Sequence, residues 1–316
     1  MTTGESIAPP EGEQLVLGVT WAGGTPALDL AAVDTGRAGR LPVLGGSVGW
    51  RVTRPGRYCT GWYGAVAGEG QRLPCPDAAP AATSGQCLDC AARDQFRFAH
   101  HGHLGGYVPA ALETYLAQRQ WLYVATFPDG FTKVGTAAEH RKQTRLDEQG
   151  PALATYIALA DNGRLVREAE DLISHELEVS QHRRRAAKVA AYVNPAPVRW
   201  VESRHRETVA QARQLVADSV WPGPVHPAAD DWTPPAALGA LREPPPGAAR
   251  VLYPLDVAAG EHGLMFDACA GSAALARTGP GPDAIHYVVD LGALAGVRLV
   301  FGRYISPETE VQESLF

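Results

Sequence analysis

The sequence has no long apolar run and no basic, apolar leader. No stretch approaches the roughly 20 consecutive apolar residues that a membrane-spanning helix needs. The first residues, MTTGESIAPPEGEQ, lack the basic and apolar segments of a signal sequence. These two absences predict a cytoplasmic protein with no membrane partner. The sequence does not indicate the oligomeric state.

Cysteine is scarce, and its spacing is informative. The chain has five cysteines, and an odd number in a cytoplasmic protein disfavours a disulfide framework. Four of them form the pattern C-x15-C-x11-C-x2-C, which suits the four thiolates of a structural zinc site. The predicted Zn²⁺ ligands are Cys59, Cys75, Cys87 and Cys90.

Other interpretations of the cysteines stay open. One histidine of the nearby cluster could replace a thiolate, and the candidates are His100, His101 and His103. A redox Cys-x-x-Cys pair needs a strand before it and a helix after it, whereas the preceding segment PDAAPAATSGQ is typical of a loop. Cys269 stands alone in the apolar run MFDACAGSAALA and is predicted to be a buried small side chain.

Positive charge is not abundant overall, and the net charge of -6 excludes a uniformly basic coat. Half of the 28 Lys and Arg residues nevertheless fall between residues 131 and 220. A polyanion such as nucleic acid would therefore bind the middle of the chain. A solvated basic face is the alternative interpretation, because cations are also favoured at helix C-termini.

Composition divides the chain into four regions. Short apolar runs separated by Gly and Pro predict a β-rich zinc-binding domain over residues 1–107 and a β-rich C-terminal domain over residues 250–316. The stretch 221–249 is rich in proline, which predicts a linker. Residues 108–220 alternate between helical and strand patterns and form the central domain.

Sequence patterns predict the order of strands and helices in the central domain. WLYVATF and FTKVG flank a Pro-Asp-Gly turn, which predicts a hairpin, and TAAEHRKQTRLDEQ predicts a helix that ends at Gly150. ALATYIALA predicts a third strand, and REAEDLISHELEVSQH predicts a second helix with an apolar face. A short helix precedes the hairpin, and a longer one is predicted over residues 201–220.

The two strand tripeptides, LYV at residues 122–124 and KVG at residues 133–135, resemble those of the GIY-YIG nuclease superfamily. The central tyrosine of the first tripeptide is present as Tyr123, whereas Lys133 replaces the tyrosine that opens the second. The resemblance implies an α+β fold, with a GIY-YIG-like three-stranded antiparallel sheet and helices between the two β-rich regions. It also implies a metal-dependent nuclease or phosphodiesterase acting on DNA or RNA.

Two further site residues follow from the resemblance. Arg145 in QTRLDEQG matches the superfamily arginine by position, and Glu170 in REAEDLI matches the glutamate that holds a divalent metal. Arg141 and Glu168 are the nearest rivals for these roles. The sequence also resembles, more closely, an uncharacterised bacterial family with a cysteine-rich N-terminal part and the central signature KVG, Arg, Gln-Gly.

Physical chemistry explains why such a site needs these residue types. A lone carboxylate with phosphate oxygens and waters can hold Mg²⁺ or Mn²⁺, and an arginine fork donates two hydrogen bonds to a phosphate. Tyr123 could orient or deprotonate the attacking water, and Lys133 could lower the pKa of that tyrosine or contact the phosphate. Three alternatives remain: a surface ion pair of no catalytic consequence, a zinc-stabilised module that binds nucleic acid or protein, and small-molecule chemistry.

Overall fold

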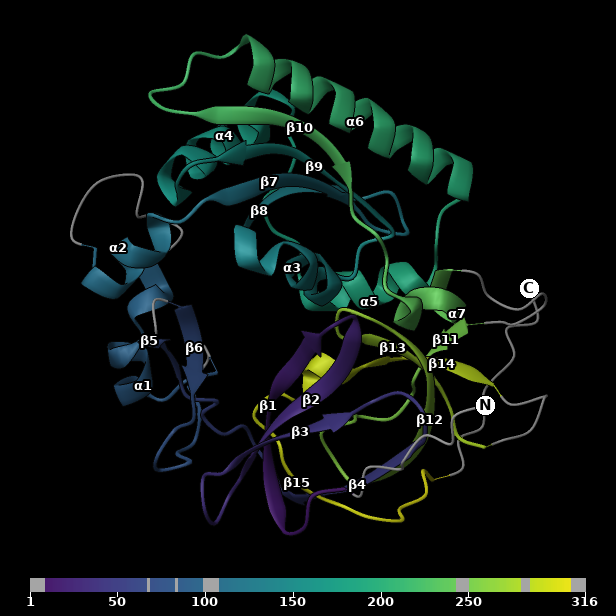
Figure 1. The fold of residues 1–316 in the computed structure, drawn as a ribbon. Coiled ribbons are helices and arrows are strands. Elements are labelled where there is room, and N and C mark those ends of the chain that lie inside the picture. Colours follow the sequence, from purple (N-terminus) through teal and green to yellow (C-terminus); the bar gives the residue numbers. More distant parts are fainter. Residues whose placement is uncertain are drawn as a thin grey trace.

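The computed structural model describes residues 9–66, 69–82, 85–98, 108–242, 250–279 and 285–307. These residues form sheets of nine, four and two strands with helices around them, so the predicted α+β class is confirmed (Figure 1). No helix within the described ranges is long and apolar enough to cross a membrane.

The central sheet has four antiparallel strands in the order β10-β9-β7-β8, one more than the three predicted, because a strand from the proline-rich stretch pairs with its edge. Their bounds are β7 Gln120–Thr126, β8 Thr132–Ala138, β9 Leu153–Ala160 and β10 Val225–Asp231. The predicted hairpin is present as β7 and β8. Its turn requires a left-handed residue, which Gly130 supplies with a φ of 81°.

Helices cover both faces of this sheet (Figure 1). One face carries the long helices α4 and α6, packed on Leu122, Val124 and Ile157, and the other carries α3 and α5. The order strand, strand, helix, strand, helix agrees with the expectation from the sequence. The helices of this region are α2 Ala110–Leu116, η2 Glu139–Arg141, α3 Lys142–Gln149, α4 Gly163–Glu176, α5 Arg185–Val193 and α6 Val198–Asp218.

The helix that carries Glu170 is shorter than its sequence pattern predicts. It ends at Glu176, and Glu178 then adopts a positive φ of 53°, which is incompatible with continuing a right-handed helix. The chain instead runs beside β8, where Val134 N donates to Ser180 O at 3.0 Å. The basic triplet at residues 183–185 therefore leads into a separate helix, α5, rather than closing α4.

The described part of the proline-rich stretch, residues 221–242, forms secondary structure, whereas the sequence predicts a linker. It contributes β10 to the central sheet, the turn η3 Ala236–Leu238 and the short helix α7 Gly239–Arg242. Pro227 is tolerated because β10 is an edge strand, and its pairing with β9 becomes irregular between Pro227 and Asp230. Edge placement of this kind cannot be deduced from proline content alone.

The nine-stranded sheet joins strands from both ends of the chain in the order β11-β14-β13-β12-β4-β15-β1-β2-β3. Strands that the sequence divides between an N-terminal and a C-terminal region therefore pair directly, as β1 does with β15 (Figure 1). Their bounds are β1 Glu13–Ala22, β2 Thr25–Ala32, β3 Ala38–Pro42, β4 Ser47–Arg54, β11 Arg250–Leu252, β12 Glu261–Ala270, β13 Ala273–Arg277, β14 His286–Asp290 and β15 Arg298–Phe301, with η4 Leu291–Leu294 before β15.

The two-stranded sheet belongs to a small unit beside the other two. It consists of β5 Trp62–Val66 and β6 Glu69–Leu73, followed by α1 Leu88–Arg93 and η1 Gln95–Phe98. Its buried centre contains three cysteines instead of large apolar side chains. Such a unit has too little apolar surface to be stable without a cross-link or a metal.

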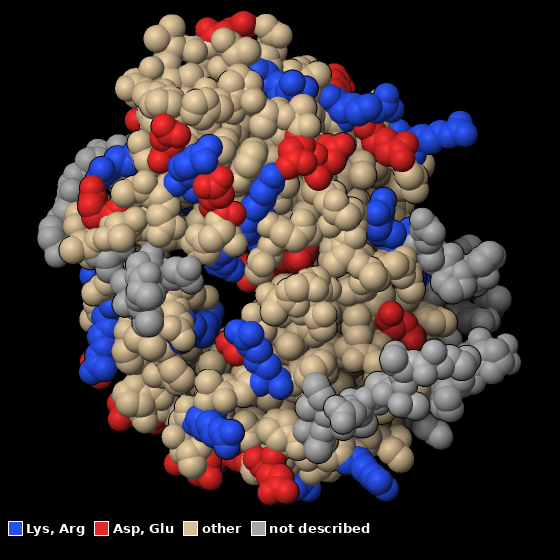
Figure 2. Space-filling model, viewed as in Figure 1, with Lys and Arg blue, Asp and Glu red and all other residues tan. Residues whose placement is uncertain are grey.

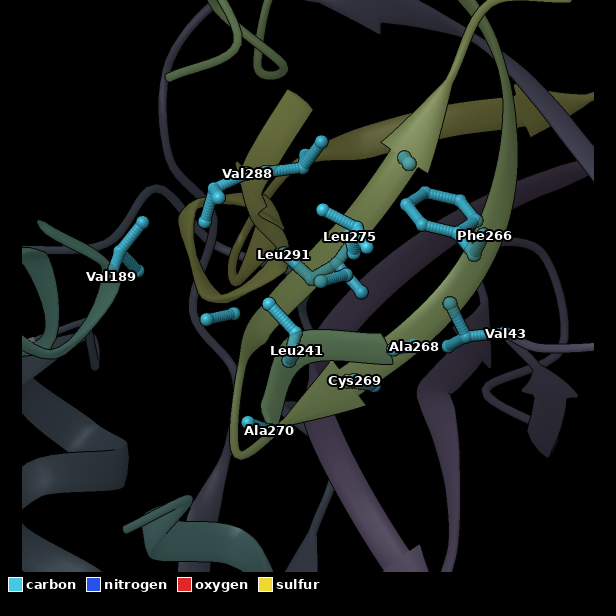
Figure 3. Packing of buried hydrophobic residues seen from close by; sticks show 14 of the residues in the cluster. Val43, Val189, Leu241, Phe266, Ala268, Cys269, Ala270, Leu275, Val288 and Leu291 are labelled. Carbon is cyan, nitrogen blue, oxygen red and sulfur yellow. The ribbon is translucent and has the colours of Figure 1, made fainter. Parts of the chain in front are cut away.

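One hydrophobic core connects the nine-stranded sheet with the central domain. It includes Phe266 and Leu275 of the large sheet, Val189 of α5 and Tyr123 of β7. Figure 3 shows Leu241 beside Leu291 at this sheet, with Val189 farther to the left. Cys269 is fully buried here, as the sequence predicts, and burial raises the pKa of its thiol to about 12.

Candidate functional site

Four cysteines from three segments meet in the small unit. The Sγ atoms of Cys59, Cys75, Cys87 and Cys90 all lie within 4.8 Å of one another, and none of these residues is in a disulfide. Cys59 follows β4, Cys75 follows β6, and the remaining two lie at the start of α1. This arrangement is compatible with a tetrahedral zinc site.

Three of the four thiols have shifted pKa values. Burial raises the pKa of Cys59 and of Cys90, whereas the backbone N–H of Cys90 lowers the pKa of Cys87 by donating to its sulfur. Buried thiols do not ionise without positive charge nearby, and a divalent metal supplies that charge. The donor set therefore fits zinc. The alternative ligands His100, His101 and His103 lie outside the described residues.

Tyr123 and Lys133 share the face of the central sheet that α3 and α5 cover. Tyr123 is fully buried opposite Gly135, and a Cβ at Gly135 would lie 2.5 Å from the phenol oxygen. Glycine is therefore required for the tyrosine to occupy this position. Lys133 is 5% exposed, and its Nζ lies 5.9 Å from the centre of the Tyr123 ring.

Arg145 reaches the same place from α3. Burial acts to lower the pKa of Arg145, but the phenol of Tyr123, the carboxylate of Glu148 and the phenol of Tyr115 together raise it. Arg145 is thus held in its charged form beside Tyr123. The Tyr123 hydroxyl itself has no hydrogen bond of normal geometry within the described part of the chain.

Glu170 has a different environment. It lies on α4, whose apolar residues Ala169 and Ile173 pack on the opposite face of the sheet. Its side chain is buried, and Oε2 pairs with Arg167 Nη1 at 2.5 Å. The sequence-predicted residues therefore divide into a group of three and a separate ion pair. A catalytic Mg²⁺ or Mn²⁺ would find one carboxylate here, the minimum for an ion that keeps most of its water.

The two rival residues are engaged elsewhere. Arg141 Nη2 donates to Glu148 Oε1 at 2.6 Å, and Glu168 is exposed on the outer side of α4, where it lines a separate hollow. Arg145 and Glu170 are the more buried members of each pair, so they remain the candidates for the site.

A residue that the sequence places only in the basic region 131–220, and not in the site, joins the group of three. Lys188 of α5 donates from Nζ to Gln149 Oε1 at 2.7 Å and lies 5.5 Å from the centre of the Phe127 ring. Burial and the nearby charges of Lys133, Arg145 and Arg183 lower the pKa of Lys188 to about 7. The available signal was one lysine in the otherwise small and apolar run AAKVAAYV.

A cavity of about 760 Å³ lies between α3, the nine-stranded sheet and the small cysteine unit. Arg141 and Glu148 line it from the central domain, and Arg145 lies between them in the sequence, one helical turn from each. Arg40 and Arg72 line it from the other two units. Figure 2 shows this face hollowed below the central domain, with basic side chains around the opening.

Comparison of the chain with family models, with curated proteins and with solved structures gives no match. Its function is therefore inferred from the geometry of the site.

Proposed function

We propose that the protein is a metal-dependent nuclease or phosphodiesterase acting on DNA or RNA. The observation that carries this proposal is the convergence of Tyr123, Lys133 and Arg145 from β7, β8 and α3 on one face of an antiparallel sheet. A tyrosine between two cations is suited to a phosphoryl group, because the cations stabilise its charge and the phenol can exchange a proton.

Each residue has a distinct role in this reaction. Arg145 binds the non-bridging phosphate oxygens through its planar fork, and Lys133 adds charge that stabilises the transition state. Tyr123 orients the attacking water and, once its own proton has gone to solvent, accepts the proton of that water as a phenolate. Glu170 would hold Mg²⁺ or Mn²⁺, which supplies Lewis acidity when bound; because α4 packs on the opposite face of the sheet, the substrate would have to extend around the sheet edge to reach that metal. Zinc at the four cysteines has a structural role, because all four coordination positions are taken by protein.

The cavity beside α3, which Tyr123, Lys133 and Arg145 do not line, is a candidate contact surface for a polyanionic substrate. Three arginines from three separate units line it, namely Arg40, Arg72 and Arg141. Arg40 lies 4.0 Å from Asp29 and Arg141 pairs with Glu148, whereas Arg72 donates to Leu17 O and Tyr63 Oη. Arginines in these positions attract a phosphate backbone without reading its sequence.

The test is cleavage of single-stranded and double-stranded DNA and RNA in Mg²⁺ or Mn²⁺. Glu170→Gln and Arg145→Gln are each expected to lower the cleavage rate by about 100-fold or more, because each removes stabilisation of the transition state. Glu168→Gln is the matched control, since this carboxylate lies on the same helix and is exposed. Equal cleavage by wild type and Glu170→Gln would refute the metal-binding role.

The pairing of Glu170 with Arg167 favours a second candidate, a zinc-stabilised module that binds nucleic acid without cleaving it. A buried carboxylate already neutralised by an arginine is an ordinary structural element. Salt-dependent binding that Glu170→Gln leaves unchanged, with no cleavage in either metal, would select this candidate.

A further inference from the structure

The chain contains only three lysines, and all of them border the central sheet: Lys133, Lys142 and Lys188. Lys142 forms an ion pair with Asp230. The other two lack a carboxylate partner in the part of the chain that the structure describes. Lys188 bonds to the neutral amide of Gln149, and Lys133 lies over the ring of Tyr123.

The neighbouring arginines do not remove this excess of positive charge. Arg183 is neutralised by Asp129, which accepts two hydrogen bonds from it at 2.8 and 2.5 Å. Arg145 has Glu148 nearby, but Oε1 of that carboxylate is already bonded to Arg141. The face around Tyr123 therefore holds more cations than anions. The residue Lys133 is 5% exposed, and the Tyr123 hydroxyl is enclosed.

Such an arrangement is costly for a folded protein by itself. Cations without matching carboxylates repel one another, and the enclosed Tyr123 hydroxyl has Arg145 beside it but no hydrogen bond of normal geometry. An oxyanion suits this cluster, since it carries the missing negative charge and accepts several hydrogen bonds. Lys188 keeps partial exposure, whereas Lys133 is 5% exposed, so Lys188 lies on the solvent side of the cluster.

We propose that Lys188 is a further anion-binding residue of this site, and that its amine takes up one proton from solvent when a phosphate group enters beside Lys133 and Arg145. The choice of phosphate rests on the proposed function. Burial is the main cause that lowers the pKa of Lys188 to about 7, and the charges of Lys133, Arg145 and Arg183 add to it; an incoming dianion offsets those charges. Proton uptake then converts a neutral amine into a charged ligand, which couples anion binding to pH.

Selective labelling of the lysines tests this proposal on the intact chain. Reductive methylation with ¹³C-formaldehyde labels three lysines and the N-terminus, and the methyl signals report the titration of each amine. Lys188→Arg and Lys142→Arg identify their signals by loss. Without phosphate, the Lys188 signal is expected to titrate at about pH 7. In saturating inorganic phosphate its midpoint should rise by about one unit or more, while Lys142 stays unchanged.

Calorimetry gives an independent readout. Binding of inorganic phosphate at pH 7.5 is measured in buffers of different ionisation enthalpy, which yields the number of protons taken up. Wild type should take up a substantial fraction of one proton, whereas Lys188→Met should take up none and bind phosphate about tenfold more weakly. Lys142→Met is the matched control and should behave as wild type does.

The outcomes separate this proposal from the proposed function. Phosphate binding that leaves the Lys188 titration and the proton count unchanged overturns the role of Lys188, even if the enzyme cleaves nucleic acid. Proton-coupled phosphate binding without any cleavage supports the role of Lys188 and refutes the nuclease. Absence of phosphate binding at millimolar concentration also overturns the inference.

Discussion

At the scale of single residues, the face around Tyr123 departs from the usual rule that buried polar groups find partners. The phenol hydroxyl of Tyr123 is enclosed without a hydrogen bond of normal geometry, and Lys133 is buried beside it. Both exceptions occur at one place. Groups that lower the stability of the folded state thus lie at the proposed ligand site, which is a common property of functional sites.

The variant Tyr123→Phe tests this trade-off. Because the enclosed hydroxyl lacks a hydrogen bond of normal geometry and the ring is kept, the free energy of unfolding should change by no more than about 1 kcal/mol. Nucleic-acid cleavage should fall strongly, since the proton-transferring group is lost. Urea unfolding and a cleavage assay on the same preparations check both results. A marked loss of stability would show that the hydroxyl has a structural role.

Gly135 is predicted to be the most size-restricted position of the site. An added Cβ would lie 2.5 Å from Cζ and Oη of Tyr123. Gly135→Ala should therefore displace the tyrosine and lower the free energy of unfolding by about 1–3 kcal/mol. Gly239→Ala is the control: a Cβ added there would have no atom within 4 Å, so the stability of this variant should be unchanged or slightly higher. Equal unfolding midpoints for the two variants would contradict the prediction.

At the scale of elements, a buried histidine connects α6 to two strands of the central sheet. His205 Nδ1 lies 2.9 Å from Thr126 Oγ1 on β7, and Nε2 lies 3.0 Å from Thr155 Oγ1 on β9. Thr155 donates its own proton to Asp231, so it must accept from His205. Nε2 therefore carries the proton, and Nδ1 accepts from Thr126. The neutral ring satisfies all of these groups.

This contact predicts a pH dependence of stability. Burial lowers the pKa of His205 from 6.5 to about 4, and Asp231 offsets this only in part. Because the folded pKa is below the unfolded one, the stabilisation is complete above about pH 6.5 and is lost as pH falls toward 4. The loss should amount to about 3 kcal/mol. Urea unfolding at pH 7 and pH 4.5 should show a smaller pH effect in His205→Gln than in wild type.

The sequence predicts the elements of the central domain well, for physical reasons. The strands of residues 120–138 and 153–160 alternate with amphipathic helices, and local patterns of this kind depend little on distant contacts. The limits of α4 and the presence of β10 depend on non-local features, namely the positive φ of Glu178 and the edge position of Pro227. Composition does not encode such features.

The same distinction between local patterns and non-local features applies to the candidate site. The cysteine spacing sufficed to predict the cluster that the structure brings together. Thiols that are close in the sequence can meet without contacts to distant parts of the chain. Tyr123, Lys133 and Arg145 share a face because they lie on consecutive elements of one motif. Lys188 could not be assigned, since its neighbours Gln149 and Phe127 come from loops and helices distant in the chain.

At the scale of the whole molecule, the cysteine unit is predicted to depend on its metal. The purified protein should contain about one zinc ion per chain, and Cys87→Ala should contain none, because three thiolates rarely suffice for a structural site. Cys269→Ala is the control, since that cysteine is buried in another core. Metal analysis by mass spectrometry checks the content, and an unchanged zinc content in Cys87→Ala would contradict the assignment.

Removal of zinc by a chelator should have a local effect. Hydrogen exchange should accelerate over the described residues between 57 and 98, where the cysteine unit has little apolar core of its own. The central sheet at residues 120–160 has a separate apolar cluster and should keep its protection. Faster exchange throughout the chain would show that the units are energetically inseparable.

The nine-stranded sheet has a consequence for synthesis. In that sheet β4 lies between β12 and β15, and β1 pairs with β15. During synthesis, β1 and β4 therefore emerge more than 200 residues before these partner strands. The central domain has mostly neighbouring contacts and can fold while the ribosome is still translating the C-terminal strands. During that interval β1 and β4 present unpaired edges, which are prone to aggregation. A chaperone that holds nascent chains should therefore raise the yield of this protein.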